Sequence, residues 1–132
     1  MAEKFSPMAA LVGRIFIAVI FLNSGYGKIM GFAGTQKYME SHGLPLVSIL
    51  LVSAIFAEIA GGLSLVLGVY TRLGALALLL FMIPTTLIFH TDFTQRIQVI
   101  HFLKNLAIMG GILAFMAMGD GGLGYDSWRK RG

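Results

Sequence analysis

Four long apolar segments dominate this 132-residue chain and limit what it can fold into. A helix needs about 20 mainly apolar residues to cross the hydrocarbon layer of a bilayer, which is about 30 Å thick. Within lipid a helix also satisfies its own backbone hydrogen bonds, which an isolated extended segment cannot do. The sequence therefore predicts four membrane-spanning helices, over residues 7–30, 46–69, 72–90 and 97–118.

The composition indicates that lipid is the solvent for much of the surface. Hydrophobic residues make up 57% of the chain and charged residues 12%, whereas soluble domains average about 45–50% and about 25%. A chain of this length forms one domain and cannot bury so much apolar surface internally. We expect residues 1–132 to form a single all-α domain, an antiparallel bundle of four transmembrane helices, with residues 119–132 as a basic C-terminal tail.

Cysteine is absent, and this excludes several kinds of chemistry. The chain can form no disulfide, no thiolate metal site and no dithiol relay. Membrane enzymes that exchange disulfides with quinones are thereby excluded, and no metal site is expected. The basic cluster Arg129–Arg131 beside four spans indicates an anchor near anionic lipid rather than a nucleic-acid-binding surface.

The connections and their charges predict the topology. Residues 31–45 form the longest connection, in which residues 35–39 are expected to form a short interfacial helix. Four spans place both termini and the second connection on one side of the membrane. Basic residues are more frequent on that side, which predicts that both termini are cytoplasmic. The count is Lys4, Arg72, Arg129, Lys130 and Arg131 on the terminal side, against Lys37 and Arg96 on the other.

Ionisable residues inside the spans carry most of the functional information, because each is costly in lipid unless it has a partner. At about 1.5 Å per residue, Arg14 lies about 9 Å and Glu58 about 12 Å from the terminal face. The shared depth predicts a buried Arg14–Glu58 ion pair, with a structural role favoured over a catalytic one. Lys28 and Arg72 are interpreted as anchors at the membrane interfaces.

A second polar level is expected in the half of the bundle opposite the termini. His101, Lys104 and Asn105 share one helix face because they are three and four residues apart. Asn23 falls at the same depth, and His90 ends the neighbouring helix. These five residues predict one polar ligand pocket. Pro84 interrupts the hydrogen bonding of the third span and is expected to open space beside it.

The chain resembles the DoxX family of small four-helix bacterial inner-membrane proteins, and within it a branch of uncharacterised inner-membrane proteins. The resemblance covers most of the chain, and the string from Ala33 to Met39 is its most specific part. It implies a multi-pass protein of the bacterial inner membrane. The other residues that carry it are Gly13-Arg14, Gly25 to Lys28, Glu58, Gly61-Gly62, Gly68 to Arg72, His90, Lys104-Asn105 and Tyr125-Asp126.

The resemblance implies a quinone-linked oxidoreductase component or a subunit that binds a quinone or another lipophilic ligand. In that reading His90, His101, Lys104 and Asn105 supply hydrogen bonds to the quinone carbonyls. No flavin, metal or thiol centre is evident, so a redox partner protein would supply electrons. Two alternatives stay open: a small transporter that uses Glu58 for proton coupling, and a structural or scaffold subunit of a membrane complex. Whether the chain is an enzyme and whether it forms a homo-oligomer also stay open.

Overall fold

The computed structural model describes residues 2–131, with side chains for residues 6–130. The side chains of Lys4 and Arg131, counted above for orientation, therefore lie outside the described part. Four helices are long and apolar enough to cross a membrane, which confirms the predicted all-α transmembrane bundle. The helices are α1 (Ala2–Met30), α2 (Phe32–Ser41), α3 (Val47–Leu67), α4 (Thr71–Phe89), α5 (Arg96–Met118) and α6 (Tyr125–Arg131).

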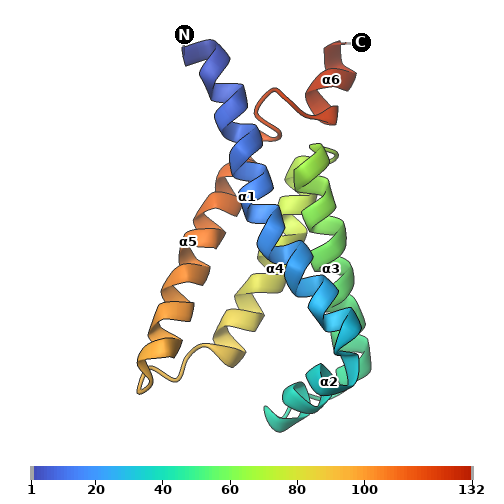
Figure 1. The fold of residues 1–132 in the computed structure, drawn as a ribbon, viewed down its shortest axis with the longest axis vertical. Coiled ribbons are helices and arrows are strands. Elements are labelled where there is room, and N and C mark those ends of the chain that lie inside the picture. Colours follow the sequence, from blue (N-terminus) through green and yellow to red (C-terminus); the bar gives the residue numbers. More distant parts are fainter. Residues whose placement is uncertain (1, 132) are drawn as a thin grey trace.

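The four spans run antiparallel in chain order, and both termini lie at the same end (Figure 1). The principal interfaces join α1 to α3, α3 to α4 and α4 to α5. Helix α1 extends well past the end of α3 at the terminal end, where the C-terminal segment lies beside it (Figure 1). At the opposite end α2 turns away from the end of α1 and packs against α3. We call these the terminal end and the α2 end.

Small residues let α3 approach both of its neighbours closely. A Cβ atom added to Gly62 would lie 2.8 Å from the side chain of Leu22 on α1. A Cβ added to Gly61, on the other side of α3, would lie 2.6 Å from Leu78 on α4. Membrane helices associate through this kind of close packing, because lipid gives them no hydrophobic drive to do so. The glycine pair therefore sets the spacing of three helices.

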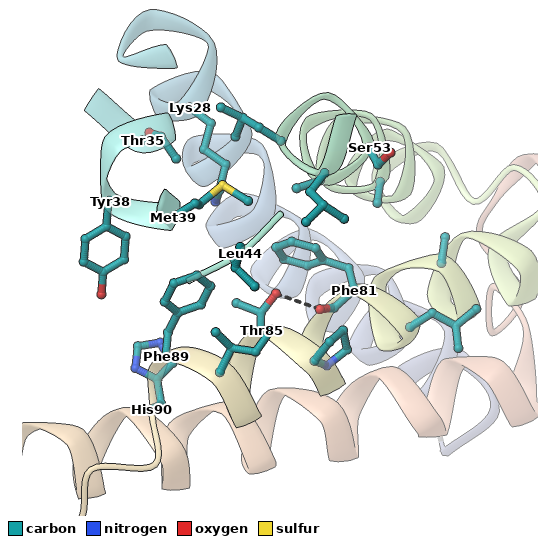
Figure 2. A pocket seen from close by; sticks show the side chains of 18 residues that line it. Lys28, Thr35, Tyr38, Met39, Leu44, Ser53, Phe81, Thr85, Phe89 and His90 are labelled. Carbon is teal, nitrogen blue, oxygen red and sulfur yellow. Dashed lines mark hydrogen bonds between the residues drawn. The ribbon is translucent and has the colours of Figure 1, made fainter. Parts of the chain in front are cut away.

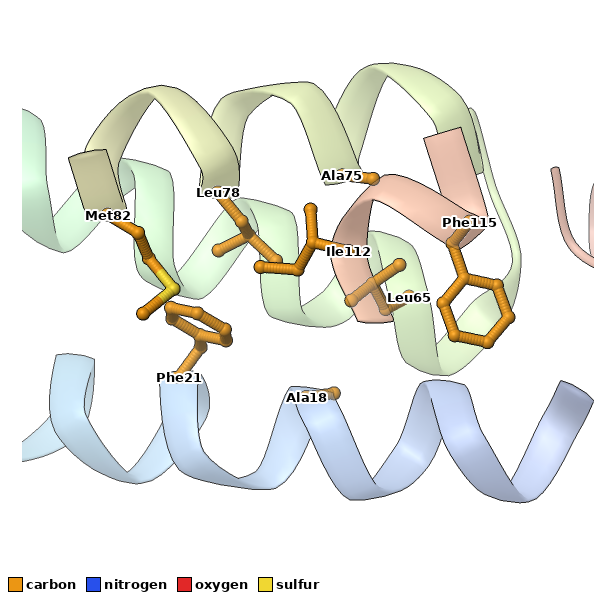
Figure 3. Close-up of a cluster of buried hydrophobic side chains, with 8 residues drawn as sticks. All are labelled: Ala18, Phe21, Leu65, Ala75, Leu78, Met82, Ile112 and Phe115. Carbon is orange, nitrogen blue, oxygen red and sulfur yellow. The ribbon is translucent and has the colours of Figure 1, made fainter. Parts of the chain in front are cut away.

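Side chains from all four spans meet in one buried apolar cluster near the middle and terminal end of the bundle. Phe21 of α1 lies near Met82 of α4, and Ile112 and Phe115 bring α5 against the others (Figure 3). Ile112 and Phe115 are the buried residues of α5. The other members of the cluster are Ala18, Leu65, Ala75 and Leu78.

The helix bounds differ from the predicted ones mainly at the two ends of the chain. Helix α1 begins at Ala2 and holds Pro7 inside its second turn, whereas the prediction began the helix there. Helix α2 covers Phe32–Ser41, more than the predicted residues 35–39. Residues after Met118 turn back onto the bundle and end in α6, so the tail is more than a basic anchor.

Candidate functional site

Glu58 is paired with Lys28 and not, as predicted, with Arg14. The Lys28 Nζ lies 2.7 Å from Oε1 of Glu58 and donates a 2.7 Å hydrogen bond to Oγ of Ser24. The Glu58 side chain is 1% exposed and that of Lys28 is 24% exposed. Lys28 also lies over the ring of Phe81, with Nζ 5.6 Å from the ring centroid. Lys28 therefore points into the bundle and is not the interfacial anchor that the sequence predicted.

The predicted pairing failed because helix depth was measured from the wrong starting point. In the α1–α3 interface, Gly25 lies opposite Glu58 and Ile59. Arg14 precedes Gly25 by eleven residues, which at about 1.5 Å per residue is about 16 Å along α1. The predicted depth of about 9 Å for Arg14 takes the membrane face to lie about six residues before it, but α1 projects past the end of α3 (Figure 1). Arg14 consequently lies near the end of α3 and cannot reach Glu58.

Arg14 binds the C-terminal segment instead. Its buried guanidinium donates a 2.8 Å hydrogen bond from Nη1 to the backbone oxygen of Leu65 at the end of α3. From Nη2 it donates a second hydrogen bond to the backbone oxygen of Leu123. A Cβ added to Gly68 would lie 2.7 Å from Nη1, so glycine leaves room for the guanidinium there. Arg14 thus ties α1 to the end of α3 and to the tail.

Two aspartates complete the attachment of the tail. Asp126 accepts 2.8 Å hydrogen bonds from the backbone N–H groups of Tyr70 and Thr71, and one of 2.9 Å from the Thr71 hydroxyl. It therefore caps the start of α4, where Tyr70 is in the left-handed conformation with φ 46°. Asp120 accepts hydrogen bonds from the backbone N–H groups of Gly122 and Ser127.

These hydrogen bonds determine the ionisation of both aspartates. Burial alone would raise the pKa of each carboxyl. The hydrogen bonds from Ser127 and Gly122 to Asp120, and from Thr71 and Tyr70 to Asp126, outweigh burial and hold both pKa values below the ordinary value. The tail is consequently attached through two ionised carboxylates.

A cavity of about 580 Å³ lies at the α2 end, between α2, α3 and α4. Figure 2 shows Lys28 and Met39 entering it opposite Phe81 and Thr85 of α4. Its lining is largely apolar. The lining residues are Lys28 of α1; Thr35, Tyr38, Met39 and Leu44 from α2 and its following loop; Leu50, Leu51, Ser53, Ala54 and Ala57 of α3; and Ala77, Leu80, Phe81, Pro84, Thr85, Ile88, Phe89 and His90 of α4 and its end.

Lys28 is the charged residue in this lining, and it keeps one unused hydrogen-bond donor. A lysine ammonium has three N–H donors. One of them is donated to Ser24 and the ion pair with Glu58 occupies a second side of the ammonium, and no further acceptor is found among the described residues. The cavity therefore combines an apolar slot with one ammonium donor, whose charge is balanced by the buried carboxylate of Glu58.

Aromatic residues gather where α2 meets the end of α4. Tyr38 of α2 stacks on Phe89 of α4, with ring centroids 5.3 Å apart. The ring of His42 lies 4.7 Å from that of Phe89 and 4.6 Å from that of Tyr38. Since Tyr38 and Phe89 both line the cavity, this group holds α2 across one side of it.

The predicted polar pocket is assembled only in part. The rings of His90 and His101 have centroids 5.1 Å apart, and Asn105 donates a 3.0 Å hydrogen bond to Oγ1 of Thr86 on α4. Asn23 and Lys104 have exposed side chains, and neither lines a described cavity. His90 is the one member of the predicted set that lines the 580 Å³ cavity. Pro84 does border open space, as expected, but in this cavity.

Sequence reasoning missed the central position of Lys28 and the whole tail attachment. A signal for Lys28 was present: it follows Gly25 by three residues, and Gly25 lets α1 approach α3. Lysine at that position reaches back along α1, because helical side chains lean toward the N-terminus. The tail offered no comparable signal, since Asp120 stands among glycines and Asp126 lies in a segment of only seven helical residues.

The sequence has clear relatives. The DoxX family model matches residues 9–91, a range that includes every lining residue of the 580 Å³ cavity. Inner membrane protein YqjF of Escherichia coli (strain K12) is 38% identical over 124 residues, covering 94% of this chain and 94% of that protein. Inner membrane protein YphA of the same strain is 32% identical over 125 residues, covering 91% of this chain and 89% of that protein. No solved structure matches the chain.

Proposed function

We propose that this chain, which belongs to the DoxX family, is an inner-membrane protein that binds a quinone-like lipophilic carbonyl compound and serves as a component of a quinone-linked oxidoreductase. The observation that carries the proposal is the apolar cavity with the Lys28 ammonium in its wall. Its volume of about 580 Å³ falls in the range of small-molecule sites, roughly 300–1,000 Å³.

The chemistry of the cavity suits this class of ligand. A quinone has a flat apolar ring with carbonyl oxygens that need hydrogen-bond donors, and it reaches its site from the lipid. The third N–H of Lys28 supplies a charged donor, and Thr85 and His90 in the same lining supply polar groups. Glu58 holds the ammonium in place by the ion pair. A charge-assisted hydrogen bond of this kind contributes about 1.5–3 kcal/mol to binding.

Electrons would come from a partner protein in this scheme. The chain contains no cysteine, and no group of three metal-binding side chains occurs among residues that the structure describes. The role proposed for this chain is accordingly to hold the quinone where a redox partner can reach it. Orientation belongs to the same proposal: both termini are cytoplasmic, so the cavity lies toward the periplasmic side.

Binding of a short-chain benzoquinone to the purified protein in nanodiscs tests the proposal. Lys28→Met combined with Glu58→Gln removes the donor without leaving a buried charge, and we expect affinity to fall by about tenfold to hundredfold. The matched control is Lys104→Met, which removes an exposed lysine outside the cavity and should leave affinity unchanged.

A second variant tests the cavity itself. Ala57→Phe places a large ring in the lining while Lys28 and Glu58 remain, and it should abolish binding. If the wild-type protein binds no benzoquinone, or if both cavity variants bind as well as the wild type, the proposal is wrong. Loss of melting temperature with unchanged affinity would indicate that the Lys28–Glu58 pair serves only the fold, as in a scaffold subunit.

A further inference from the structure

A second cavity, of about 330 Å³, lies at the terminal end between the start of α4, the end of α5 and α6. Three cationic side chains line it: Arg72 from the first turn of α4, and Arg129 and Lys130 from α6. Arg72 is 57 or more positions from Arg129 and Lys130 in the sequence, and the attachment of the tail brings it beside them. This cavity is separate from the one proposed above, which lies at the α2 end.

The three cations have no partner within the described part of the chain. All three side chains are exposed, and the structure shows no ion pair or side-chain hydrogen bond for them. The cavity also contains Asp120 and Asp126, but their oxygens already accept hydrogen bonds from the tail and from the start of α4. Buried Arg14 adds positive charge close to both aspartates. With three cations and two carboxylates in its lining, and Arg14 close by, the cavity keeps a net positive charge.

The guanidinium of Arg72 has a defined place in this cavity. A Cβ added to Gly119 would lie 3.4 Å from Nε of Arg72, so the guanidinium packs against the backbone of Gly119. Gly119 has φ +77°, a conformation that favours glycine. The planar fork of an arginine binds phosphate oxygens through two parallel hydrogen bonds. Arg72 is thus held in a position from which it can bind an anion.

The lining combines cations with apolar side chains at the ends of the spanning helices. Leu73, next to Arg72 in the first turn of α4, and Met118, the last residue of α5, are both exposed. Exposed aromatic residues, Tyr70 and Trp128, stand at the same level, which is typical of the membrane–water boundary. A phospholipid presents the same combination of groups at that boundary, a phosphate beside the start of the acyl chains.

We infer that this cavity binds the phosphate group of an anionic phospholipid, with Arg72 and Arg129 on the phosphate, Lys130 beside it, and Leu73 and Met118 against the acyl chains. Attraction of basic residues to anionic lipid is a general property of membrane proteins. The inference here is more specific: the folded tail and the start of α4 form one headgroup site.

Native mass spectrometry of the purified protein, titrated with phosphatidylglycerol or phosphatidylcholine in detergent, tests the site. The site variant is Arg72→Gln/Arg129→Gln. The matched control is Lys37→Gln/Arg96→Gln, which removes two exposed cations from the α2 end. We expect phosphatidylglycerol to bind the wild type and the control equally and the site variant about tenfold or more weakly. Phosphatidylcholine should bind all three weakly.

Two further arms separate the sources of phosphate and guard against misfolding. Inorganic phosphate at millimolar concentration should not displace phosphatidylglycerol. Displacement would overturn the lipid assignment and favour a soluble phosphate. Arg129→Gln alone changes only an exposed residue of α6, so it keeps the test valid if the double variant unfolds. Equal phosphatidylglycerol binding by the control and the site variants would overturn the inference.

Discussion

Lys28 and Glu58 differ in their access to solvent, and this difference predicts how their substitution affects stability. Glu58 is almost fully buried and Lys28 is about a quarter exposed. Breaking a buried ion pair by removing one partner costs about 3–5 kcal/mol, because the other charge is left uncompensated. Glu58→Leu should therefore lower the free energy of unfolding by about 3 kcal/mol. This is the lower end of the range, because the Lys28 side chain that loses its partner is partly exposed.

The double variant Lys28→Leu/Glu58→Leu should be more stable than Glu58→Leu alone, because it leaves no unpaired charge. Denaturant unfolding in detergent, followed by helical circular dichroism, measures both variants. A double variant that loses as much as the two single variants together would show that the two side chains do not interact. Lys104→Leu, at an exposed position, serves as the control and should change stability little.

At this scale the sequence shows which residues are costly to place in lipid, but not which of them meet. Arg14, Lys28 and Glu58 stand out by charge alone. Their partners depend on the register of α1 against α3. The predicted register was displaced by about three helical turns, and it therefore placed Arg14 beside Glu58 instead of Lys28. The register follows from the close packing of Gly25 and Gly62 across the interface, which only the structure displays.

At the scale of elements, the tail shows how a short helix can be fastened by its carboxylates. Asp120 and Asp126 have pKa values below the ordinary value in the folded protein, despite the opposing effect of burial. A carboxyl group whose pKa is lower in the folded than in the unfolded protein stabilises the folded state at pH values above its unfolded pKa of about 3.9. This stabilisation is lost as the pH falls through the pKa of the folded state. The tail should accordingly stay attached at neutral pH and detach only in acid, as the pH falls below about 3.9 through the lowered pKa values of the two aspartates.

Trp128, the single tryptophan of the chain, lies in α6 and reports this change by its fluorescence. We expect its emission to shift on titration from pH 6 to pH 3, and we expect Asp126→Asn to show the detached spectrum already at pH 6. Asp92→Asn, in the exposed loop before α5, is the control and should titrate like the wild type. If Asp126→Asn retained the wild-type curve, Asp126 would not hold the tail.

The spans and the tail differ in how far the sequence predicts them. Each span is a continuous apolar segment and can be found without knowing its neighbours, so α3, α4 and α5 agree with the predicted bounds to within two residues. The segment after Met118 is rich in glycine and suggests a loose tail. In the structure Gly121 and Gly122 instead adopt positive φ and pack against Ala10 and Pro7 of α1. That fit depends on residues more than 110 positions away.

At the scale of the whole molecule, the proposed orientation decides which side of the membrane each cavity faces. Basic residues flank the terminal end more than the α2 end, and the proposal that the termini are cytoplasmic rests on this asymmetry. Alkaline phosphatase fused after residue 132 should therefore be inactive, and green fluorescent protein fused at the same position should be fluorescent. Strong phosphatase activity would reverse the orientation and place the 580 Å³ cavity toward the cytoplasm.

The hydrogen bond from Arg14 to Leu123 joins residues 109 positions apart, and it imposes an order on synthesis. Arg14 enters the membrane with the first span, when most of the chain has not yet been made. Its acceptor on the tail is made 109 residues later. Until then the guanidinium must rely on water or lipid headgroups at the membrane surface. A nascent chain that stops before Leu123 therefore leaves the Arg14 guanidinium without this acceptor.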